Sequence, residues 1–580
     1  MAVRTQNVLK LIPEARDFAE LIKAGGYYVD KTPYLKEIFE FNSRVLIIRP
    51  DGFGKTLMMS ALRHFLETDY EHPGDTSKQR ELFKGLKILE DQDFCEKHLG
   101  QHPVVFFAPK PAGGDTFDQA YKGLCEDISS LYGEFSWLLH SDRLDEDDRR
   151  NFRRAADVNS LLNGGELGRE HARVSLHDLC RLLSKHCQKE AVLIIDGLDD
   201  LLQQAAEHGY FEEMSGIISP MLSRSSFYTS DYMCEEIISG RLRPVGGDLF
   251  GSDLDHFDAN TALTQNRNLC TAFGFTPDEA KEALTAFGLE SLYGKAREEC
   301  GGYSVYGREL FCPGDLISFI ASNRGAAPAA AARENGSLIT AFLPKMRYDD
   351  AQSLQKLLDG GTAKLWIDEY LSHGPAERIT SRFFWNILFY RGFLTVAKRC
   401  PDYEYEFRIP NLKMRKCLAE PVTRYREEPG GQYFKAYSER IVRLLTGGGY
   451  DRIAAAINMA LSVYVSLRVL ENGRPAEGWY CDLFRGILLS AQSLIGSRQA
   501  CSDNSCAAFT SASGDTGTVI ALRYSPEREG LQDQANEALG QLEGCDEAAA
   551  LRKAGAGRIF EWGIALWDRQ CAVAFKELNP

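Results

Sequence analysis

The chain has 580 residues, of which 44% are hydrophobic, 11% aromatic and 26% charged. At roughly 100–200 residues per domain this length predicts about three to five domains, and the composition excludes a mainly disordered, collagen-like or membrane-embedded protein. The net charge of −15 excludes a protein whose whole surface binds phosphate groups nonspecifically. The 15 cysteines form no CxxC pair, and no run of residues has the pattern of a signal peptide or a membrane span, so we expect a reduced, cytoplasmic protein without a membrane partner.

Short apolar runs alternate with helical patterns over residues 1–270. Val45–Ile48, Val104–Phe107 and Ala191–Ile195 have the composition of strands that are buried on both faces. A helical pattern over Thr56–Glu67 follows the first of them. Strands that alternate with helices favour an α/β domain, in which helices cover both faces of a parallel sheet.

The rest of the chain divides into a mainly helical middle and a second α/β region. A low-complexity segment, AAPAAAARENG, begins at residue 326 and marks the change. We predict a helical, winged-helix-like or lid region over 271–432, in which Tyr403–Ile409 alternates like a half-buried strand. An α/β domain is expected over 433–580. Its predicted helices are Trp479–Leu494 and Leu531–Leu542, and its predicted strands are Thr518–Tyr524 and Arg558–Trp567.

The strongest motif is the segment RPDGFGKT, which ends at Thr56. A P-loop binds phosphates through backbone N–H groups, a lysine and the N-terminus of a helix, and its hydroxyl residue binds Mg²⁺. Gly52, Gly54, Lys55 and Thr56 supply the end of this pattern, whereas Arg49 stands where the full motif begins with glycine. The segment therefore predicts a P-loop NTPase site for ATP and Mg²⁺. The alternative is a tight turn that carries Gly-Lys-Thr by chance.

Asp196 ends the third apolar run and is predicted to bind Mg²⁺ together with Thr56. Hydrolysis needs a further carboxylate that orients the attacking water, and the next residue is Gly197. Asp199, with Asp200 beside it, is therefore the candidate catalytic acid. The alternative is that both acids form a helical first turn, which the helix dipole stabilises. Weaker candidates for contact with the phosphates are Arg224, Thr229, Ser230 and Arg241.

Five further segments carry a family resemblance. They are Gly25–Tyr34 (GGYYVDKTPY), Phe273–Glu279 (FGFTPDE), Gly301–Tyr303 (GGY), Leu388–Thr395 (LFYRGFLT) and Ile409–Asn411 (IPN). Together with the P-loop they resemble the bacterial AAA-ATPase-like family, whose members typically carry a C-terminal nuclease-like domain of the PD-(D/E)XK superfamily. The resemblance implies an ATP-binding domain at the start of the chain and a restriction-endonuclease-like α/β domain at its end.

The chain departs from this family at its acids and its P-loop. Where the family's P-loop reads RPRRFGKT, this chain has Asp51 in place of an arginine. Where the family's acidic strand end reads DEYD, this chain has Gly197 in place of the glutamate. In the nuclease motif, Ala507 stands at the position of the aspartate. Ala521 stands at that of the glutamate, and Arg523 at that of the lysine, in the E-x-K element. Alanine binds no Mg²⁺. The nearby acids that could replace the missing ones are Asp503 and Asp515.

These features predict a nucleotide-binding protein with weakened or absent hydrolysis, whose nuclease-like domain is inactive and acts in binding or regulation. One alternative is an active ATP-dependent nuclease whose acids lie at other positions. Another is a scaffold without either activity, which serves protein–protein contact. The expected partners are a nucleotide, nucleic acid through a local patch, and a second copy of the chain or another protein. The expected domains are 1–270, 271–432 and 433–580.

Overall fold

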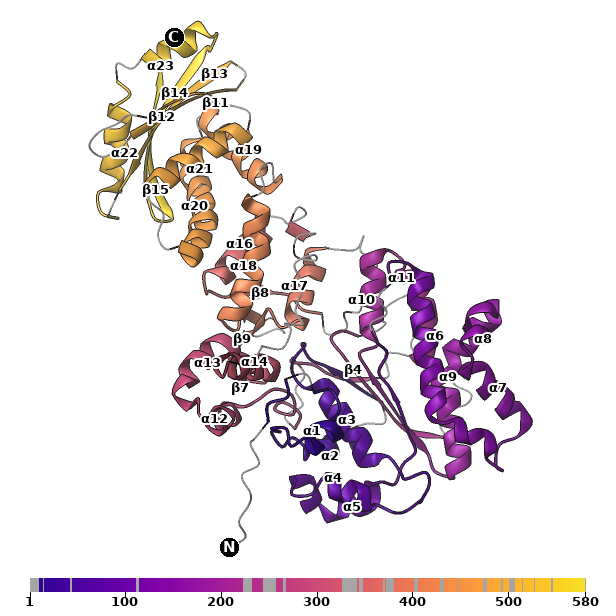
Figure 1. Ribbon diagram of the computed structural model, residues 1–580. Helices are drawn as coiled ribbons and strands as arrows, with labels where there is room; N and C mark the ends of the chain where they lie inside the picture. Colours follow the sequence, from indigo (N-terminus) through magenta and orange to yellow (C-terminus); the bar gives the residue numbers. More distant parts are fainter. Residues whose placement is uncertain are drawn as a thin grey trace. The chain divides into compact units, whose positions relative to one another are not determined.

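The computed structural model divides the chain into two compact units (Figure 1). The first comprises residues 1–334 and 364–415, and the second comprises residues 335–363 and 416–580. The expected division into three domains stays a prediction. The structure describes residues 10–13, 15–41, 44–110, 114–222, 232–243, 257–263, 268–325, 339, 342–343, 348–368, 371, 380–400, 405–427, 432–447, 449–472, 477–491, 494–499, 506–513, 515–525, 527–543 and 546–578.

A fully parallel five-stranded sheet forms the centre of the first unit. Its strands are β1 (Arg44–Ile48), β2 (Val104–Phe107), β3 (Ala191–Asp196), β4 (Met233–Gly240) and β5 (Asp258–Asn260). They lie in the order β2-β3-β4-β1-β5. Because the strands are parallel, β1, β3 and β4 end at one edge of the sheet, where Ile48 pairs with Gly240 and Asp196 with Ser239.

Helices cover both faces of this sheet (Figure 1). Those before β4 are α1 (Phe18–Lys23), α2 (Tyr34–Phe39), α3 (Lys55–Leu66), α4 (Ser77–Leu82), α5 (Gln92–His98), α6 (Phe117–Glu134), α7 (Glu146–Ala156), α8 (Val158–Asn163), α9 (Gly165–Cys187), α10 (Asp199–His208) and α11 (Phe211–Leu222), with short 3₁₀ turns at Lys87–Glu90 and Ser136–His140. The chain crosses from β1 to β2 through α3 and returns to β3 through α9. Right-handed crossovers in opposite directions place these two helices on opposite faces. The α/β fold predicted for this region is confirmed.

Short helices and two small sheets make up the rest of the first unit. They are α12 (Pro277–Ala286), a 3₁₀ turn (Glu290–Leu292), α13 (Tyr293–Cys300), β6 (Tyr303–Val305), β7 (Arg308–Leu310), α14 (Pro313–Asn323), β8 (Ala363–Leu365, whose first residue belongs to the second unit), α17 (Ser381–Tyr390), β9 (Thr395–Arg399) and β10 (Tyr405–Arg408). Nδ2 of Asn411 donates to the carbonyl oxygen of Gly301 at 2.9 Å, and Nη2 of Arg408 donates to that of Gly302 at 2.6 Å. The GGY and IPN segments of the sequence therefore contact each other. The winged-helix-like interpretation stays a prediction.

A mixed five-stranded sheet forms the second unit. The elements are α16 (Tyr348–Leu358), α18 (Leu412–Glu427, whose start belongs to the first unit), α19 (Gln432–Thr446), α20 (Tyr450–Asn472), α21 (Glu477–Ser490), β11 (Leu494–Gln499), β12 (Cys506–Ser513), β13 (Thr516–Tyr524), α22 (Leu531–Gly540), α23 (Asp546–Lys553), β14 (Arg558–Trp567) and β15 (Gln570–Leu578). The strands lie in chain order, and only β13 and β14 pair in parallel. The helix predicted to reach Leu494 stops at Ser490, and Leu494 begins β11 instead.

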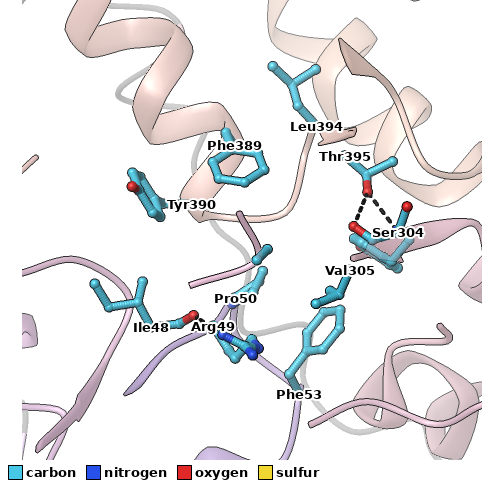
Figure 2. A pocket seen from close by; sticks show the side chains of 12 residues that line it. Ile48, Arg49, Pro50, Phe53, Ser304, Val305, Phe389, Tyr390, Leu394 and Thr395 are labelled. Atoms are coloured by element: carbon cyan, nitrogen blue, oxygen red, sulfur yellow. Dashed lines mark hydrogen bonds between the residues drawn. The ribbon is translucent and has the colours of Figure 1, made fainter. Parts of the chain in front are cut away.

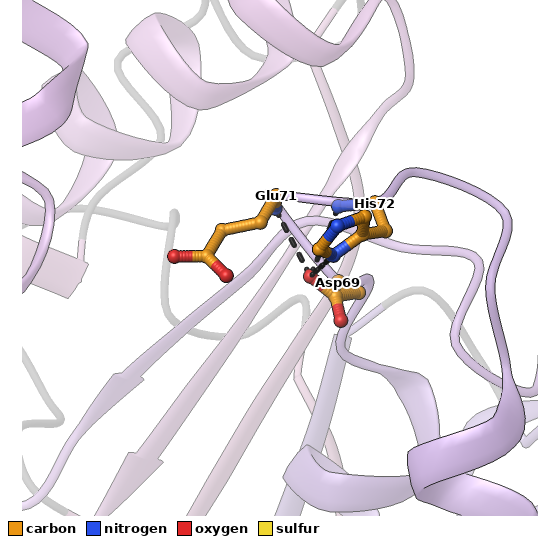
Figure 3. Close-up of side chains that lie close together, drawn as sticks. All are labelled: Asp69, Glu71 and His72. Atoms are coloured by element: carbon orange, nitrogen blue, oxygen red, sulfur yellow. Dashed lines mark hydrogen bonds and ion pairs between the residues drawn. The ribbon is translucent and has the colours of Figure 1, made fainter.

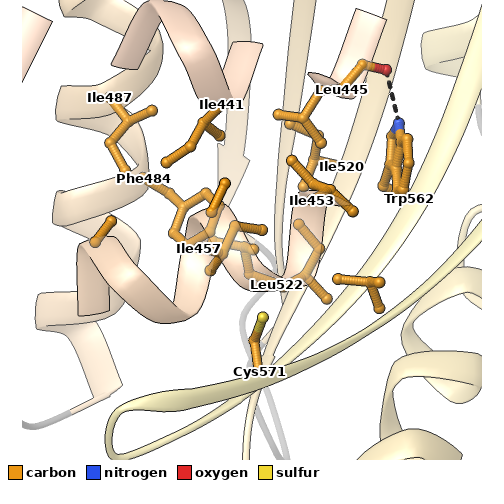
Figure 4. Close-up of a cluster of buried hydrophobic side chains, with 14 of the residues drawn as sticks. Ile441, Leu445, Ile453, Ile457, Phe484, Ile487, Ile520, Leu522, Trp562 and Cys571 are labelled. Carbon is orange, nitrogen blue, oxygen red and sulfur yellow. Dashed lines mark hydrogen bonds between the residues drawn. The ribbon is translucent and has the colours of Figure 1, made fainter. Parts of the chain in front are cut away.

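One face of this second sheet packs against α19, α20 and α21. Ile457 and Phe484 from the helices meet Ile520 and Trp562 from the strands (Figure 4). Nε1 of Trp562 donates to the carbonyl oxygen of Leu445 at 3.0 Å, which satisfies the buried indole. The other face is covered by α22 and α23. The apolar helix α20 is therefore part of this core, and no helix among the described residues is long and apolar enough to cross a membrane.

Candidate nucleotide-binding site

The segment between β1 and α3 forms a loop with free space beside its last glycine. Gly52 and Gly54 have φ angles of +79° and +86°, which residues with side chains adopt only with strain. Gly54 is the N-cap of α3, and Lys55 and Thr56 are the first two residues of the helix. A Cβ atom added to Gly54 would meet no atom within 4 Å. The loop therefore has the helix N-terminus and the lysine that phosphate binding needs, and the hydroxyl that Mg²⁺ binding needs.

Arg49, which replaces the first glycine of the full motif, packs against β5. Only 1% of its surface is exposed. Nη1 donates to the carbonyl oxygens of Ile48 at 2.8 Å and Asn260 at 2.9 Å, and Nη2 donates to Oδ1 of Asn260 at 2.7 Å. Burial lowers the pKa of this guanidinium to about 10. The arginine joins the loop to the edge strand, so this departure from the motif serves the fold.

Lys55 holds its amine inside the loop. Nζ donates to the carbonyl oxygens of Arg49 at 2.8 Å and Pro50 at 3.1 Å. The same nitrogen lies 3.9 Å from Oδ1 of Asp51. This is the position from which a P-loop lysine meets the β- and γ-phosphates of a nucleotide.

Backbone hydrogen bonds tie the loop to the region that follows the sheet. The amide of Gly314, at the start of α14, donates to the carbonyl oxygen of Gly52 at 2.9 Å. The amide of Gly274 donates to that of Phe53 at 3.2 Å. The conformation of the loop therefore depends on residues 268–325 as well as on the sheet.

A small pocket separates the loop from the turn between α17 and β9 (Figure 2). Phe53 and Tyr303 meet edge to face in its wall, with ring centroids 5.0 Å apart. Gly392 in the turn lies so close to the loop that an added Cβ would come within 2.9 Å of Cβ of Pro50. The pocket has a volume of about 20 Å³, which holds about one water molecule and excludes a nucleotide base. It is therefore a packing feature.

Asp196 lies beside Ser239 at the edge where the parallel strands end. Oγ of Ser239 donates to Oδ1 of Asp196, and the amide of Gly197 donates to the carbonyl oxygen of Ser239 at 2.9 Å. The hydroxyl fixes the orientation of the carboxylate. An oriented acid at the end of a strand near the P-loop suits Mg²⁺ bound together with a nucleotide.

Asp199 is buried and holds the end of β4. Its side chain is 2% exposed. Oδ2 accepts hydrogen bonds from the amides of Arg241 at 2.9 Å and Leu242 at 3.3 Å. A Cβ added to Gly240 would come within 2.5 Å of Oδ1, so the carboxylate packs directly on the backbone. This geometry favours a structural role over the predicted catalytic one.

Arg241 joins the P-loop to α10. Nη1 lies 3.3 Å from Oδ2 of Asp51, and Nη2 bonds to Oδ1 of Asp200. Burial lowers the pKa of this guanidinium, but the surrounding Asp51, Asp199 and Asp200 outweigh burial and raise the pKa above its usual range. Asp51 departs from the arginine expected in the family's P-loop, and Arg241 offsets its negative charge.

Arg391, the C-cap of α17, adds positive charge near this cluster. It is 7% exposed. Burial and the positive charge of Arg241 lower its pKa, Asp51 and Asp199 act in the opposite direction, and the net result is a pKa of about 10. A buried guanidinium beside a P-loop suits contact with phosphate oxygens. Its segment LFYRGFLT is recognisable in the sequence, but no pattern in that segment shows that the arginine is buried.

The strands expected to carry nuclease acids are adjacent and antiparallel. Ala507 on β12 pairs with Leu522 on β13, and Ala521 pairs with Ala508. Ala521 is 2% exposed and packs in the core beneath α22. Nη1 of Arg523 bonds to the carboxylate of Glu537 on α22.

The remaining sequence candidates lie elsewhere. Oδ1 of Asp515 accepts a hydrogen bond from the amide of Gly557 at 2.8 Å, which stabilises the turn before β14. Arg224, Thr229, Ser230 and Asp503 lie outside the described residues.

Asp69, Glu71 and His72 form a cluster that resembles a metal site in composition (Figure 3). Oδ1 of Asp69 accepts from the amides of Glu71 at 3.0 Å and His72 at 3.1 Å, and Oδ2 lies 2.6 Å from Nζ of Lys78. The bond to Lys78 lowers the pKa of Asp69 to about 2. Both oxygens of Asp69 therefore already stabilise this turn, and the cluster does not indicate a metal centre.

Comparison with known proteins identifies the region that carries this site. Residues 14–239 match the AAA-ATPase-like family, described as a predicted AAA-ATPase. No curated protein matches the chain. The matched residues include the P-loop, Asp196 and Ser239. Over these residues the chain is therefore similar to predicted AAA-ATPases, and the family suggests nucleotide binding with use of ATP and Mg²⁺.

Proposed function

We propose that the first unit binds ATP with Mg²⁺ in the loop between β1 and α3. The observation that carries this proposal is the position of Lys55 at the start of the helix, where its amine bonds to the loop carbonyls, with free space at the Cβ position of Gly54. Backbone N–H groups and Lys55 would bind the phosphates, and the hydroxyl of Thr56 and the carboxylate of Asp196 would hold Mg²⁺. The metal ion, when bound, neutralises phosphate charge. Arg241 and Arg391 are the nearby cations that would meet the remaining negative charge.

Hydrolysis at this site is proposed to be slow. Gly197 follows Asp196 where the resemblance leads us to expect a glutamate, and a glycine cannot orient the attacking water. Asp199 accepts two backbone hydrogen bonds and is 2% exposed, which leaves it badly suited to replace the glutamate. The nucleotide would then act mainly by stabilising one conformation of the loop and of the residues that bind it, 268–325.

Replacing Lys55 with alanine is expected to abolish stabilisation of the protein by ATP and Mg²⁺. A ligand that binds only the folded state at 100 times its Kd stabilises that state by about 2.7 kcal/mol, and the lysine supplies a principal charge for the phosphates. The measurement is the thermal unfolding midpoint with and without ATP and Mg²⁺. Lys84→Ala, which removes an exposed lysine, is the matched control and should keep the shift. No shift in the wild type, or an equal shift in Lys55→Ala, would contradict the proposed site.

For residues 433–580 we propose a nuclease-like domain that binds or regulates and does not cut. The support is the pair of adjacent strands β12 and β13, which carry Ala507 and Ala521 where the resemblance leads us to expect the acids. Arg523, the counterpart of the lysine, bonds to Glu537. Its partner would be nucleic acid at a local patch, another protein or a second copy of the chain.

The full chain is therefore expected to leave DNA and RNA intact in the presence of Mg²⁺ and ATP. Without two carboxylates, the site gains no metal ion to activate water. The measurement is gel analysis of linear double-stranded DNA, single-stranded DNA and RNA after incubation with the protein. Degradation that requires Mg²⁺ and disappears in Asp515→Ala would favour an active nuclease with displaced acids.

A further inference from the structure

We propose that Asp200 supplies the carboxylate that is missing at position 197 and accepts the proton of the water that attacks the nucleotide. This inference rests on the proposed ATP site and assigns its residual hydrolysis to one residue. No sequence motif identifies Asp200, because it stands four positions after Asp196 and follows another acid.

The side chain of Asp200 folds back over the glycine that replaces the expected glutamate. Its amide donates to the carbonyl oxygen of Gly197 at 3.1 Å, which turns the start of α10 toward that residue. Oδ2 of Asp200 lies 3.6 Å from the position of a Cβ atom added to Gly197. This is about the distance by which a glutamate side chain carries its carboxylate oxygen away from its own Cβ. Asp200 therefore brings a carboxylate within reach of the place that a glutamate at position 197 could occupy.

The side chains of the two neighbouring acids differ in their exposure to solvent. The side chain of Asp200 is 36% exposed, whereas that of Asp199 is 2% exposed. One oxygen of Asp199 accepts hydrogen bonds from two backbone amides, and Oδ1 of Asp200 accepts one from Arg241. Water can therefore reach Asp200, while Arg241 fixes its orientation relative to the P-loop, where Nη1 of Arg241 also contacts Asp51.

The charges around Asp200 suit a base that works near neutral pH. They come from its own helix (Asp199), from the end of β4 (Arg241) and from the P-loop (Asp51 and Lys55). Partial burial raises the pKa of Asp200, Asp199 and Asp51 raise it too, and Arg241 and Lys55 lower it; together these effects place it at about 6. The carboxylate is thus ionised at pH 7 and still basic enough to take a proton in the transition state.

The proposed step balances as an ordinary hydrolysis. The water oxygen forms a bond to the γ-phosphorus, and the bond between that phosphorus and the bridging oxygen breaks. The bridging oxygen keeps the electron pair as part of ADP, and the water proton passes to Asp200. Asp200 then releases the proton to phosphate or solvent. No oxidant or reductant takes part.

The test is a phosphate-release assay of the full chain with ATP and Mg²⁺ between pH 5 and pH 9. Asp200→Asn is expected to lower kcat by at least about 100-fold and to leave the Kd for ATP within about threefold of the wild type. In the wild type the rate should fall tenfold per pH unit below the pKa of the base. The midpoint should lie at or above pH 6, because phosphate charge raises the pKa of a nearby carboxylate. Asp200→Glu should regain part of the rate, because it restores a carboxylate.

One control variant and three further outcomes complete the test. Asp118→Asn removes an exposed acid from the first turn of another helix and should leave the rate unchanged. A wild type that binds ATP without hydrolysing it would overturn this inference and leave the proposed binding site standing. A wild type that does not bind ATP would overturn both. Loss of hydrolysis in Asp199→Asn, with the fold intact and Asp200→Asn active, would assign the proton transfer to Asp199.

Discussion

Replacing Glu236 with alanine is expected to destabilise the first unit by about 3–5 kcal/mol. Glu236 on β4 is the register partner of Arg44 on β1, and their side chains form an ion pair with Nε and Oε2 3.0 Å apart. The two side chains are 0% and 8% exposed, and the guanidinium lies 3.9 Å from the ring centroid of Phe257. Removing the carboxylate leaves a buried positive charge between the two central strands, and water cannot solvate it there.

A double variant separates the cost of a lone charge from the value of the pair. Replacing both partners with apolar residues of similar size, Arg44→Met with Glu236→Leu, is expected to cost less than about 1 kcal/mol or to stabilise the sheet. Hydrogen exchange of peptides that cover β1 in increasing denaturant measures the change in unfolding free energy. Peptides from β14, in the other unit, provide the internal reference. A loss below 1 kcal/mol in Glu236→Ala would show that the lone arginine finds another partner or reaches water.

The same ion pair explains which strands sequence patterns could reveal. Val45–Ile48, Val104–Phe107 and Ala191–Ile195 are uninterrupted apolar runs, and each corresponds to a strand of the sheet within one residue. The strand β4 is not recognisable from the sequence, because Glu235 and Glu236 interrupt its apolar run. A glutamate that is buried only because an arginine from another strand neutralises it cannot be distinguished from an exposed one by local pattern.

The nucleotide site was predictable in its local part and not in its tertiary part. Gly54, Lys55 and Thr56 are adjacent in the chain, so their spacing alone predicts a phosphate loop. Arg241 contacts a P-loop residue 190 positions away, and Arg391 reaches the same cluster from α17. Contacts of this kind depend on strand order, which short sequence motifs do not contain. The position of Asp200 likewise follows from the turn that begins α10.

The burial of Asp199 is likewise not visible in the local sequence. An acid three residues after a strand end is a reasonable candidate for catalysis, and its charge also suits the first turn of a helix. The decisive facts are that Gly240 has no side chain and that the amides of Arg241 and Leu242 point at the carboxylate. These facts belong to the end of β4, a strand that the sequence did not predict.

Replacing Gly563 with alanine is expected to destabilise the second unit by about 3 kcal/mol, the upper end of the usual cost of overpacking. Gly563 lies on β14 beneath α22. An added Cβ would lie 2.1 Å from the carbonyl oxygen of Ala535 and 2.4 Å from the amide nitrogen of Leu539. Both are backbone atoms of a helix, so no side-chain rotation can relieve the overlap. The helix must move away from the sheet, which exposes the interface that holds it.

Gly540→Ala is the matched control, because it adds the same methyl group to the last residue of the same helix. An added Cβ there meets nothing within 4 Å, and alanine is favoured over glycine in a helix by about 0.5–1 kcal/mol, so stability should stay equal or rise. Hydrogen exchange of peptides from α22 and β14 in increasing denaturant compares the two variants, with β1 peptides as reference. Equal stability of both variants would mean that α22 can shift on the sheet without loss. A loss confined to Gly563→Ala would show that the contact between the backbone of α22 and β14 is what holds this helix, and the Arg523–Glu537 bond with it, in place.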